Sequence, residues 1–254
     1  MQPTESLEII KLDKNNIEDE HICCSFSNKK CLEGYADKKA WLSERFSEGY
    51  VFRKLNVRGK VFIEYIPAEN GWAPIEADGF MLINCFWVSG KYKGDGHGKA
   101  LLADCLKDAE GMKGVAVITT KKKMPFASDK KFFIKNGFQV CDTAEPYFEL
   151  LHKPFDKNCT PPKFKDCAKE GLCDNRDGIT IYYTDACPFN DYYINTELTE
   201  MADKYNKKLN IVKISSKEQA QNHFVPYTNY SVFYNGRFVT HQILTKSNFE
   251  KFIS

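Results

Sequence analysis

The sequence predicts an α/β protein made of two modest domains, and three observations support this prediction. Its 254 residues exceed the roughly 100 to 200 residues of one domain. Stretches with strand-like alternation are interleaved with stretches of helical spacing. A largely apolar run of nine residues, Phe80–Val88, leads through a polar turn to Gly94, Gly96 and Gly98 and then to an apolar-periodic stretch. That order is typical of a strand, a phosphate-binding loop and a helix.

The composition is that of an ordinary globular protein, with 43% hydrophobic and 28% charged residues. A formal charge of +2 gives no electrostatic basis for a nucleic-acid or membrane partner, and neither is expected. The first twenty residues lack the apolar core of a signal peptide, and no run of about 20 apolar residues occurs, so we expect a cytoplasmic protein. Ten irregularly spaced cysteines fit reduced thiols better than a disulfide framework or a metal site. The oligomeric state stays open.

The first domain is expected over residues 1–154. Strands are predicted over Leu7–Leu12, Tyr50–Val57, Val61–Ile66, Phe80–Val88, Val115–Thr119, Phe138–Cys141 and Pro146–His152. Helices are predicted over Lys29–Ser47, Gly98–Met112 and Ser128–Asn136, the last with Ser128 as its N-cap.

The three glycines predict a site for a phosphate-bearing cofactor. Without a Cβ, the backbone approaches a ligand closely, and N–H groups at a helix start attract an anion. The spacing Gly-x-Gly-x-Gly differs from the Rossmann dinucleotide pattern, and no acidic residue ends a second strand about 20 residues on. The Gly-Lys-Ser/Thr sequence of a phosphate loop is absent too.

Two motifs, together with their spacing along the chain, resemble those of the GNAT N-acetyltransferase family. They are Lys93-Gly94-Asp95-Gly96-His97-Gly98 and Phe132-Phe133-Ile134-Lys135-Asn136-Gly137-Phe138. The resemblance covers roughly residues 7–155. It implies a GNAT fold, a mixed sheet flanked by helices and splayed at its middle, with acetyl-CoA in the V-shaped gap. Direct transfer of the acetyl group to a small-molecule or protein amine is implied as well.

The resemblance also implies which residues contact acetyl-CoA. The pantetheine arm is expected beside the backbone of one strand, and the pyrophosphate beside the glycine loop, with two further contacts from the later helix. These residues are Phe86, Trp87, Val88, Lys93, Gly94, Asp95, Gly96, His97, Gly98, Lys99, Ser128 and Phe133. Lys93 replaces the family's usual Gln or Arg and keeps a positive charge.

Two catalytic groups of the family have no counterpart at the matching positions. The tyrosine that often protonates the thiolate falls at Phe133, and the glutamate base falls near Leu82. Candidate replacements are acidic or hydroxyl residues near the expected substrate side of the sheet. They are Glu64, Glu76 and Asp78 as bases, with Tyr147 or Ser128 near the thioester. For each of these, a solvated or capping side chain is the interpretation that the sequence favours.

After a proline- and lysine-rich linker at 155–177, residues 178–254 predict a smaller α/β domain. Strand, helix, strand, helix, hairpin, helix is the thioredoxin-like order, with the first of these helices expected over Thr196–Lys207. Cys187-Pro188-Phe189-Asn190 resembles the active turn of glutaredoxins, with Asn190 in place of a second cysteine. At a helix start, Cys187 would be stabilised as a thiolate. The fold's usual cis-proline aligns with Thr228. A GNAT domain followed by such a domain resembles the YoaP-like proteins.

Three functions are compatible with these features. The first is an acetyl-CoA-dependent N-acetyltransferase, for which the sequence does not identify the amine. The second is a monothiol oxidoreductase that uses Cys187, with the first domain as an accessory. The third is a protein that binds acyl-CoA without turnover, because Phe133 cannot donate a proton.

Overall fold

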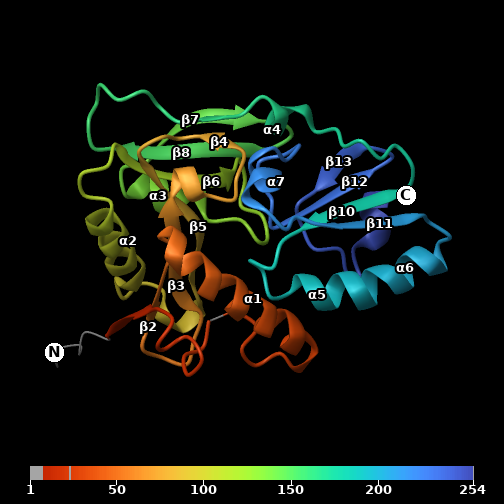
Figure 1. The fold of residues 1–254 in the computed structure, drawn as a ribbon, viewed down its shortest axis with the longest axis horizontal. Coiled ribbons are helices and arrows are strands. Elements are labelled where there is room, and N and C mark those ends of the chain that lie inside the picture. Colours follow the sequence, from red (N-terminus) through yellow and green to blue (C-terminus); the bar gives the residue numbers. More distant parts are fainter. Residues whose placement is uncertain (1–7, 23, 254) are drawn as a thin grey trace.

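A computed structural model describes residues 8–22 and 24–253 and contains a large mixed sheet beside a smaller one (Figure 1). The larger sheet has seven strands in the order β1-β2-β3-β5-β6-β8-β7. Their bounds are β1 Ile9–Leu12, β2 Val51–Leu55, β3 Val61–Pro67, β5 Phe80–Val88, β6 Gly114–Thr120, β7 Gln139–Ala144 and β8 Phe148–Pro154. The prediction of an α/β fold with a mixed sheet is confirmed. Leu7, the predicted start of the first strand, lies outside the described residues.

The large sheet opens at its centre. β5 and β6 are parallel neighbours, but they pair only from Phe80 with Gly114 to Ile83 with Val117. Beyond that point β5 continues along β3, while β6 continues along β8. The register between β3 and β5 shifts so that Asn84 has no partner, which is a β-bulge. The two strands therefore diverge and leave one edge of residues 84–88 unpaired within the sheet.

Helices cover both faces of this sheet. α2 His97–Asp108 and α3 Lys130–Lys135 pack on one face, where Leu101 and Phe133 join the core around Ile63 and Tyr65. α1 Leu32–Arg45 covers the β1–β3 end of the other face, with Trp41 and Leu42 against Phe52 and Phe62. Successive residues of β3 point to opposite faces, so Phe62 and Glu64 lie on the α1 side and Ile63 on the α2 side.

The smaller sheet has the order β11-β10-β12-β13, with β10 parallel to β11 and antiparallel to β12. Its strands are β10 Ile179–Tyr183, β11 Leu209–Lys213, β12 Tyr230–Tyr234 and β13 Arg237–Thr240. The helices of this region are α5 Asn190–Tyr192, continued by a π-helical turn over Tyr193–Leu198, then α6 Thr199–Lys204, α7 Lys217–Gln221 and α8 Phe249–Ile253.

The segment between the two sheets pairs with the first region. It contains β9 Lys163–Phe164, which is antiparallel to β4 Ile75–Glu76, and then α4 Cys167–Glu170. One core cluster, here called the shared core, takes residues from both regions. Its members include Phe80, Leu82, Phe148, Leu150, Phe164, Val225 and Phe233.

α1 and the later region are also in close contact. A Cβ on Gly34 of α1 would lie only 2.5 Å from the carbonyl oxygen of Pro188, so a larger residue there would push the two apart. Figure 1 shows α1 and α5 side by side along the lower edge of the molecule.

Two predicted helix starts differ from the structure. Asp129, not Ser128, is the N-cap of α3, because its carboxylate accepts a hydrogen bond from the Lys131 N–H. Ser128 instead forms an isolated parallel bridge with Thr119. The helix predicted from Thr196 begins six residues earlier, at Asn190. Its early turns combine large tyrosines with a π-helical stretch, which obscures the usual 3.6-residue pattern.

Candidate active site

A cavity of about 780 Å³, here called the glycine-loop cavity, lies beside the diverging end of β5. One wall is β5, the second is the start of α2, and the third is the segment that leads into α3. Its lining residues are Phe86, Trp87, Val88, Tyr92, Lys93, Gly94, Gly96, His97, Gly98, Lys99, Lys123, Met124, Pro125, Ala127, Asp129 and Phe132. All of them come from one continuous stretch of about 47 residues.

The loop glycines leave this cavity open. Gly94 has φ +99° and Gly96 has φ +84°, a left-handed conformation that residues with a Cβ rarely adopt. A Cβ at either position would meet no atom within 4 Å, so packing does not require glycine there and backbone conformation does. Gly98 differs, because a Cβ there would lie 3.1 Å from the Phe86 ring and 3.2 Å from the Phe132 ring.

The start of α2 presents free hydrogen-bond donors to the same cavity. The first helical bond runs from the Ala100 N–H to the Gly96 carbonyl, so the N–H groups of His97, Gly98 and Lys99 have no partner within the helix. The helix dipole adds positive potential at this end. Lys93, Lys99 and Lys123 also line the cavity, opposed by the single carboxylate of Asp129. The glycine-loop cavity is therefore suited to an anionic, phosphate-bearing ligand.

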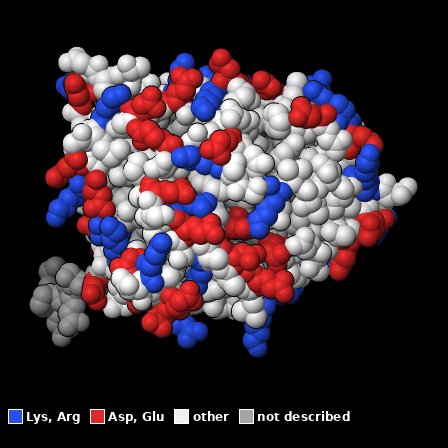
Figure 2. Space-filling model, viewed as in Figure 1, with Lys and Arg blue, Asp and Glu red and all other residues white. Residues whose placement is uncertain are grey.

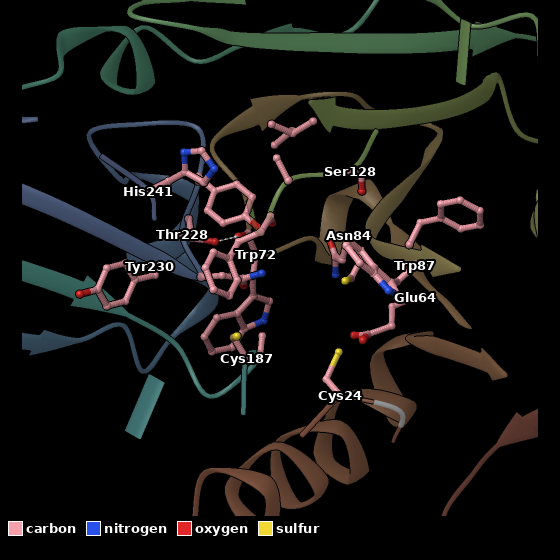
Figure 3. Close-up of a pocket in the computed structure, with 18 of the residues that line it drawn as sticks. Cys24, Glu64, Trp72, Asn84, Trp87, Ser128, Cys187, Thr228, Tyr230 and His241 are labelled. Carbon is pink, nitrogen blue, oxygen red and sulfur yellow. Dashed lines mark hydrogen bonds between the residues drawn. The ribbon is translucent and has the colours of Figure 1, made fainter. Parts of the chain in front are cut away.

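A second cavity of about 370 Å³, here called the interface cavity, lies between the large sheet, α1 and the later region. Aromatic side chains dominate its wall: Trp41, Tyr50, Phe62, Trp72, Phe86, Trp87, Phe126, Phe189, Tyr227 and Tyr230. The charged side chains in the lining are Lys38, Lys60 and Glu64. Figure 3 shows Glu64 and Cys24 on one side of this cavity and Cys187 and Thr228 on the other.

Glu64 is the one carboxylate in the lining of the interface cavity, and it is held by two neighbours. Its Oε1 is 2.5 Å from the Lys38 Nζ, and its Oε2 accepts a hydrogen bond of 2.6 Å from the Tyr50 hydroxyl. Both members of the ion pair are almost fully buried. Burial works to lower the pKa of Lys38, but the Glu64 carboxylate overrides it and raises that pKa. Lys38 is therefore charged at neutral pH.

The later region forms the opposite wall of the interface cavity. Its contributions are the turn 186–190 after β10, the loop 226–230 before β12, and His241 with Ile243 after β13. The Thr228 hydroxyl donates to the Trp72 carbonyl at 2.6 Å. The same two segments are the ones that the sequence singled out, around Cys187 and at Thr228.

His241 connects this wall to the loop before α3. Its Nε2 is 3.0 Å from the Pro125 carbonyl, which can only accept, so Nε2 carries a proton. Burial lowers the pKa of His241 to about 4, and the neutral ring therefore accepts at Nδ1 from the Tyr147 hydroxyl, 2.9 Å away. The Tyr227 hydroxyl donates to the neighbouring Phe126 carbonyl. These bonds hold Pro125 and Phe126 against the later region.

The two cavities adjoin each other. Phe86, Trp87, Pro125 and Ala127 line both, so the wall between them consists of the unpaired end of β5 and the loop before α3. A ligand in the glycine-loop cavity that extends along β5 would reach the interface cavity where these four residues meet.

Most residues predicted to contact a cofactor lie together in the glycine-loop cavity. Exceptions are Asp95, which is not in the lining, and Ser128, which lines the interface cavity instead. Phe133 is a third exception, because its side chain is fully buried among Phe86, Phe132 and Phe138, while its neighbour Phe132 lines the cavity.

The predicted catalytic candidates separate into two groups. Glu64 and Cys187 line the interface cavity. Glu76 and Asp78 do not, because they precede β5 at the end away from the divergence and are exposed, Glu76 in an ion pair with Lys163. Tyr147 is also outside the lining, since its hydroxyl is bound to His241. Leu82 is buried on β5, as expected of an apolar residue.

The environment of Cys187 does not match the predicted thiolate site. α5 starts at Asn190, so the thiol lies before the helix rather than at its first turn. Burial raises the pKa of Cys187 to about 12, although the Phe189 N–H favours the thiolate. Both features disfavour the thiolate that redox chemistry at this residue would need.

Several side chains of the interface cavity gave no sequence signal. Lys38 and Trp41 lie on the inner face of α1, and their spacing in the sequence is that of any amphipathic helix. Trp72 follows β3 in a short loop. Only tertiary packing brings them together with residues about 150 positions later, so no local motif could have identified them.

Other site types are not seen in residues 8–22 and 24–253. No group of three or more His, Cys, Asp and Glu side chains there is arranged to hold a metal ion. None of the described helices has the length and apolar content needed to cross a membrane. Figure 2 shows acidic and basic side chains interspersed over the face in view.

The mixed sheet that diverges beside a glycine-rich helix start agrees with the fold that the resemblance to the GNAT family implies. The chain is 47% identical over 247 residues to a protein of Bacillus subtilis (strain 168) described as an uncharacterized N-acetyltransferase, YoaP. That match covers 96% of this chain and 98% of the relative. The YoaP-like family also matches residues 208–251. The chain belongs to the YoaP N-acetyltransferase family.

Solved structures with partial similarity include two acetyltransferases. One is PaiA N-acetyltransferase of Thermoplasma acidophilum in complex with coenzyme A, with 17% identity and a TM-score of 0.41 over 59% of this chain and 99% of that chain. The other is a GNAT-family acetyltransferase of Staphylococcus aureus Mu50, with 17% identity and a TM-score of 0.40 over 59% of this chain and 100% of that chain.

Proposed function

We propose that the protein is an acetyl-CoA-dependent N-acetyltransferase that transfers the acetyl group directly to an amine. One observation carries this proposal: the glycine-loop cavity, built for a phosphate-bearing ligand, adjoins a second cavity with a buried carboxylate at the diverging end of β5. The family relative of Bacillus subtilis, described as an N-acetyltransferase, supports the same activity.

Different residues of the chain bind different parts of acetyl-CoA. The N–H groups of His97, Gly98 and Lys99 bind the pyrophosphate, aided by the lysines of the glycine-loop cavity. The free edge of β5 at Phe86–Val88 offers backbone N–H and C=O groups to the pantetheine arm. This path directs the thioester toward the shared wall of the two cavities.

Glu64 is the proposed base. It lies on β3, which pairs with β5, the strand that carries Leu82. The Glu64 side chain faces the interface cavity, from which an amine would approach. An amine arrives protonated, so one proton must leave before the nitrogen attacks the thioester carbonyl. The C–N bond forms, the C–S bond breaks, and the thiolate takes the second proton of the amine. Glu64 accepts the first proton and passes it to water, which balances the reaction.

The later region is proposed to be a thioredoxin-like domain over residues 178–254, joined to a GNAT domain over 1–154 by the linker 155–177. The strand order β11-β10-β12-β13, with its single parallel pair, supports this. In this protein the domain closes over the amine side of the sheet. We also propose a cytoplasmic location, consistent with the nine described cysteines, all of which are free thiols.

Thermal unfolding with acetyl-CoA tests the binding half of the proposal. At one hundred times its Kd, acetyl-CoA should stabilise the protein by about 2.7 kcal/mol, a rise in Tm of roughly 5–10 °C. An unchanged Tm at saturating acetyl-CoA would overturn the proposal. The catalytic half is tested by release of free CoA in a broad amine screen. Binding without amine-dependent release would identify an acyl-CoA-binding protein that lacks turnover.

A further inference from the structure

All three tryptophans of the chain, Trp41, Trp72 and Trp87, line the interface cavity together with seven other aromatic residues. Flat side chains on facing walls favour a flat, largely apolar ligand, because aromatic rings pack best against one another in stacked or edge-on contact. The volume of about 370 Å³ is near the lower end of the roughly 300 to 1000 Å³ of small-molecule sites. The occupant is therefore small.

The charges of the interface cavity restrict the ligand further. Lys38 is neutralised by Glu64, which leaves Lys60 as the uncompensated charge of the lining. Among the residues that the structure describes, no carboxylate lies within ion-pair distance of Lys60, and its ammonium instead lies 5.7 Å from the Phe189 ring centre. Its charge reaches into the cavity, since Lys60 acts to lower the pKa of the Cys24 thiol against the larger effect of burial.

Lys60 and Glu64 lie on the same face of one chain segment, with Phe62 between them. Lys60 directly precedes β3, and their Cα atoms are separated by four residues, about 13 Å in an extended strand. At one end of this aromatic wall Lys60 presents an uncompensated ammonium, and at the other Glu64, already paired with Lys38, presents carboxylate oxygens that accept hydrogen bonds. The wall therefore matches a ligand with an acidic group at one end and an amine at the other. Its amine would approach Glu64 and its acidic group would pair with Lys60.

We infer that the acyl acceptor is a small aromatic monoamine that carries a carboxylate at the end of the ring opposite its amine, with its acidic group on Lys60. This inference rests on the proposed function, since it names the amine of that reaction. A polyamine or an aminoglycoside is disfavoured because only one carboxylate lines the interface cavity. A lysine side chain of a protein supplies neither the ring nor the acid.

Matched pairs of amines test this inference through binding alone. With coenzyme A saturating the protein, tryptophan fluorescence reports occupancy of the interface cavity, because every tryptophan lines it. The pairs are 4-(2-aminoethyl)benzoate with 2-phenylethylamine and 4-(aminomethyl)benzoate with benzylamine. In each pair the acid should bind at least about 10-fold more tightly, equivalent to about 1.4 kcal/mol. Equal binding within both pairs overturns the inference, as does tighter binding of spermidine or a lysine peptide.

Lys60→Met tests the assigned contact. The variant should lose the 10-fold preference for the acids while it binds 2-phenylethylamine and benzylamine as the wild type does. Lys91→Met is the matched control, because Lys91 also lies over an aromatic ring, that of Tyr92, but lines neither cavity. Its preference should stay intact. A Lys60→Met protein that keeps the preference overturns the assignment, and the rise in Tm with acetyl-CoA shows that each variant is folded.

Acetyl transfer separates this inference from the proposed function. If the acids bind as expected but no CoA is released from acetyl-CoA, the ligand class stands and the transferase proposal fails. If acetyl-CoA is consumed only with spermidine or with peptides, the transferase proposal stands and the ligand class fails.

Discussion

The two cavities are built in different ways. The glycine-loop cavity is lined only by residues 86–132, so one strand, one loop and two helix starts suffice to form it. The interface cavity takes residues from Cys24 to Ile243 and exists only where three separate parts of the chain meet. This difference indicates which kinds of substitution would alter each cavity. The glycine-loop cavity is thus a local site, which depends on backbone conformation at a few positions. The interface cavity is an assembled site, which depends on how distant elements pack.

The strongest test of the local site is Gly96→Val. Valine in the left-handed conformation of Gly96 costs more than the roughly 1–2 kcal/mol of an ordinary residue, and the loop would have to change shape. We expect at least a 100-fold loss of acetyl-CoA affinity by calorimetry. Gly90→Val is the matched control, because Gly90 has ordinary φ, open space around it and no place in either lining. Unchanged affinity in Gly96→Val would show that the loop is not the binding element.

Glu64→Gln tests the assembled site. We expect the transfer rate to fall about 100-fold because the proposed base is lost, with acetyl-CoA affinity unchanged. The substitution also leaves the buried Lys38 unpaired, at a cost of about 3–5 kcal/mol in stability. The double variant Lys38→Met/Glu64→Gln separates the two effects, since it should recover stability but not transfer. Full activity in the double variant would remove Glu64 from the mechanism.

Acid should weaken the assembled site more than the local one. Burial lowers the pKa of His241 to about 4, below the ordinary 6.5, so the unfolded chain takes up this proton first. The stabilisation is complete above pH 6.5 and is lost as the pH falls toward 4. Between pH 6.5 and 5 this histidine should cost about 2 kcal/mol of unfolding free energy.

Urea unfolding at pH 7 and pH 5 measures this loss. The wild type should lose about 2 kcal/mol more than His241→Gln, because the variant lacks this titrating group. His223, whose pKa burial lowers to about 3, contributes equally to both proteins and cancels. An identical loss in the two proteins would contradict the role given to His241.

The smallest effect is expected from restoring the family tyrosine. Phe133→Tyr would place a hydroxyl in the fully buried core beneath the glycine-loop cavity, at a cost of about 1–3 kcal/mol in stability and with no gain in transfer. Phe132→Tyr is the matched change at the cavity wall and should cost less, since Phe132 is only half-buried. Faster transfer by Phe133→Tyr would mean that this side chain reaches the thioester after all.

The sequence predicted the large sheet and the glycine loop because both are local. The largely apolar stretch of β5 and the three glycines at the start of α2 can each be recognised from their own local sequence. Glu64 could be named as a candidate but not ranked above Glu76 and Asp78. Alternation along β3 tells which residues share a face of the sheet, but only the position of α1 shows that the face with Glu64 is the one that α1 covers. Trp41 and Trp72 could not be assigned at all. Their role depends on contacts with the later region, such as that of Thr228 with the Trp72 carbonyl.

The shared core also bears on how the chain folds during synthesis. Phe80, Leu82, Phe148 and Leu150 of the large sheet are covered partly by Val225 and Phe233, which are translated much later. At about 5–20 residues per second, the ribosome needs roughly 4–16 s to proceed from Leu150 to Phe233. During that interval these apolar residues of the large sheet lack part of the cover that they have in the folded protein.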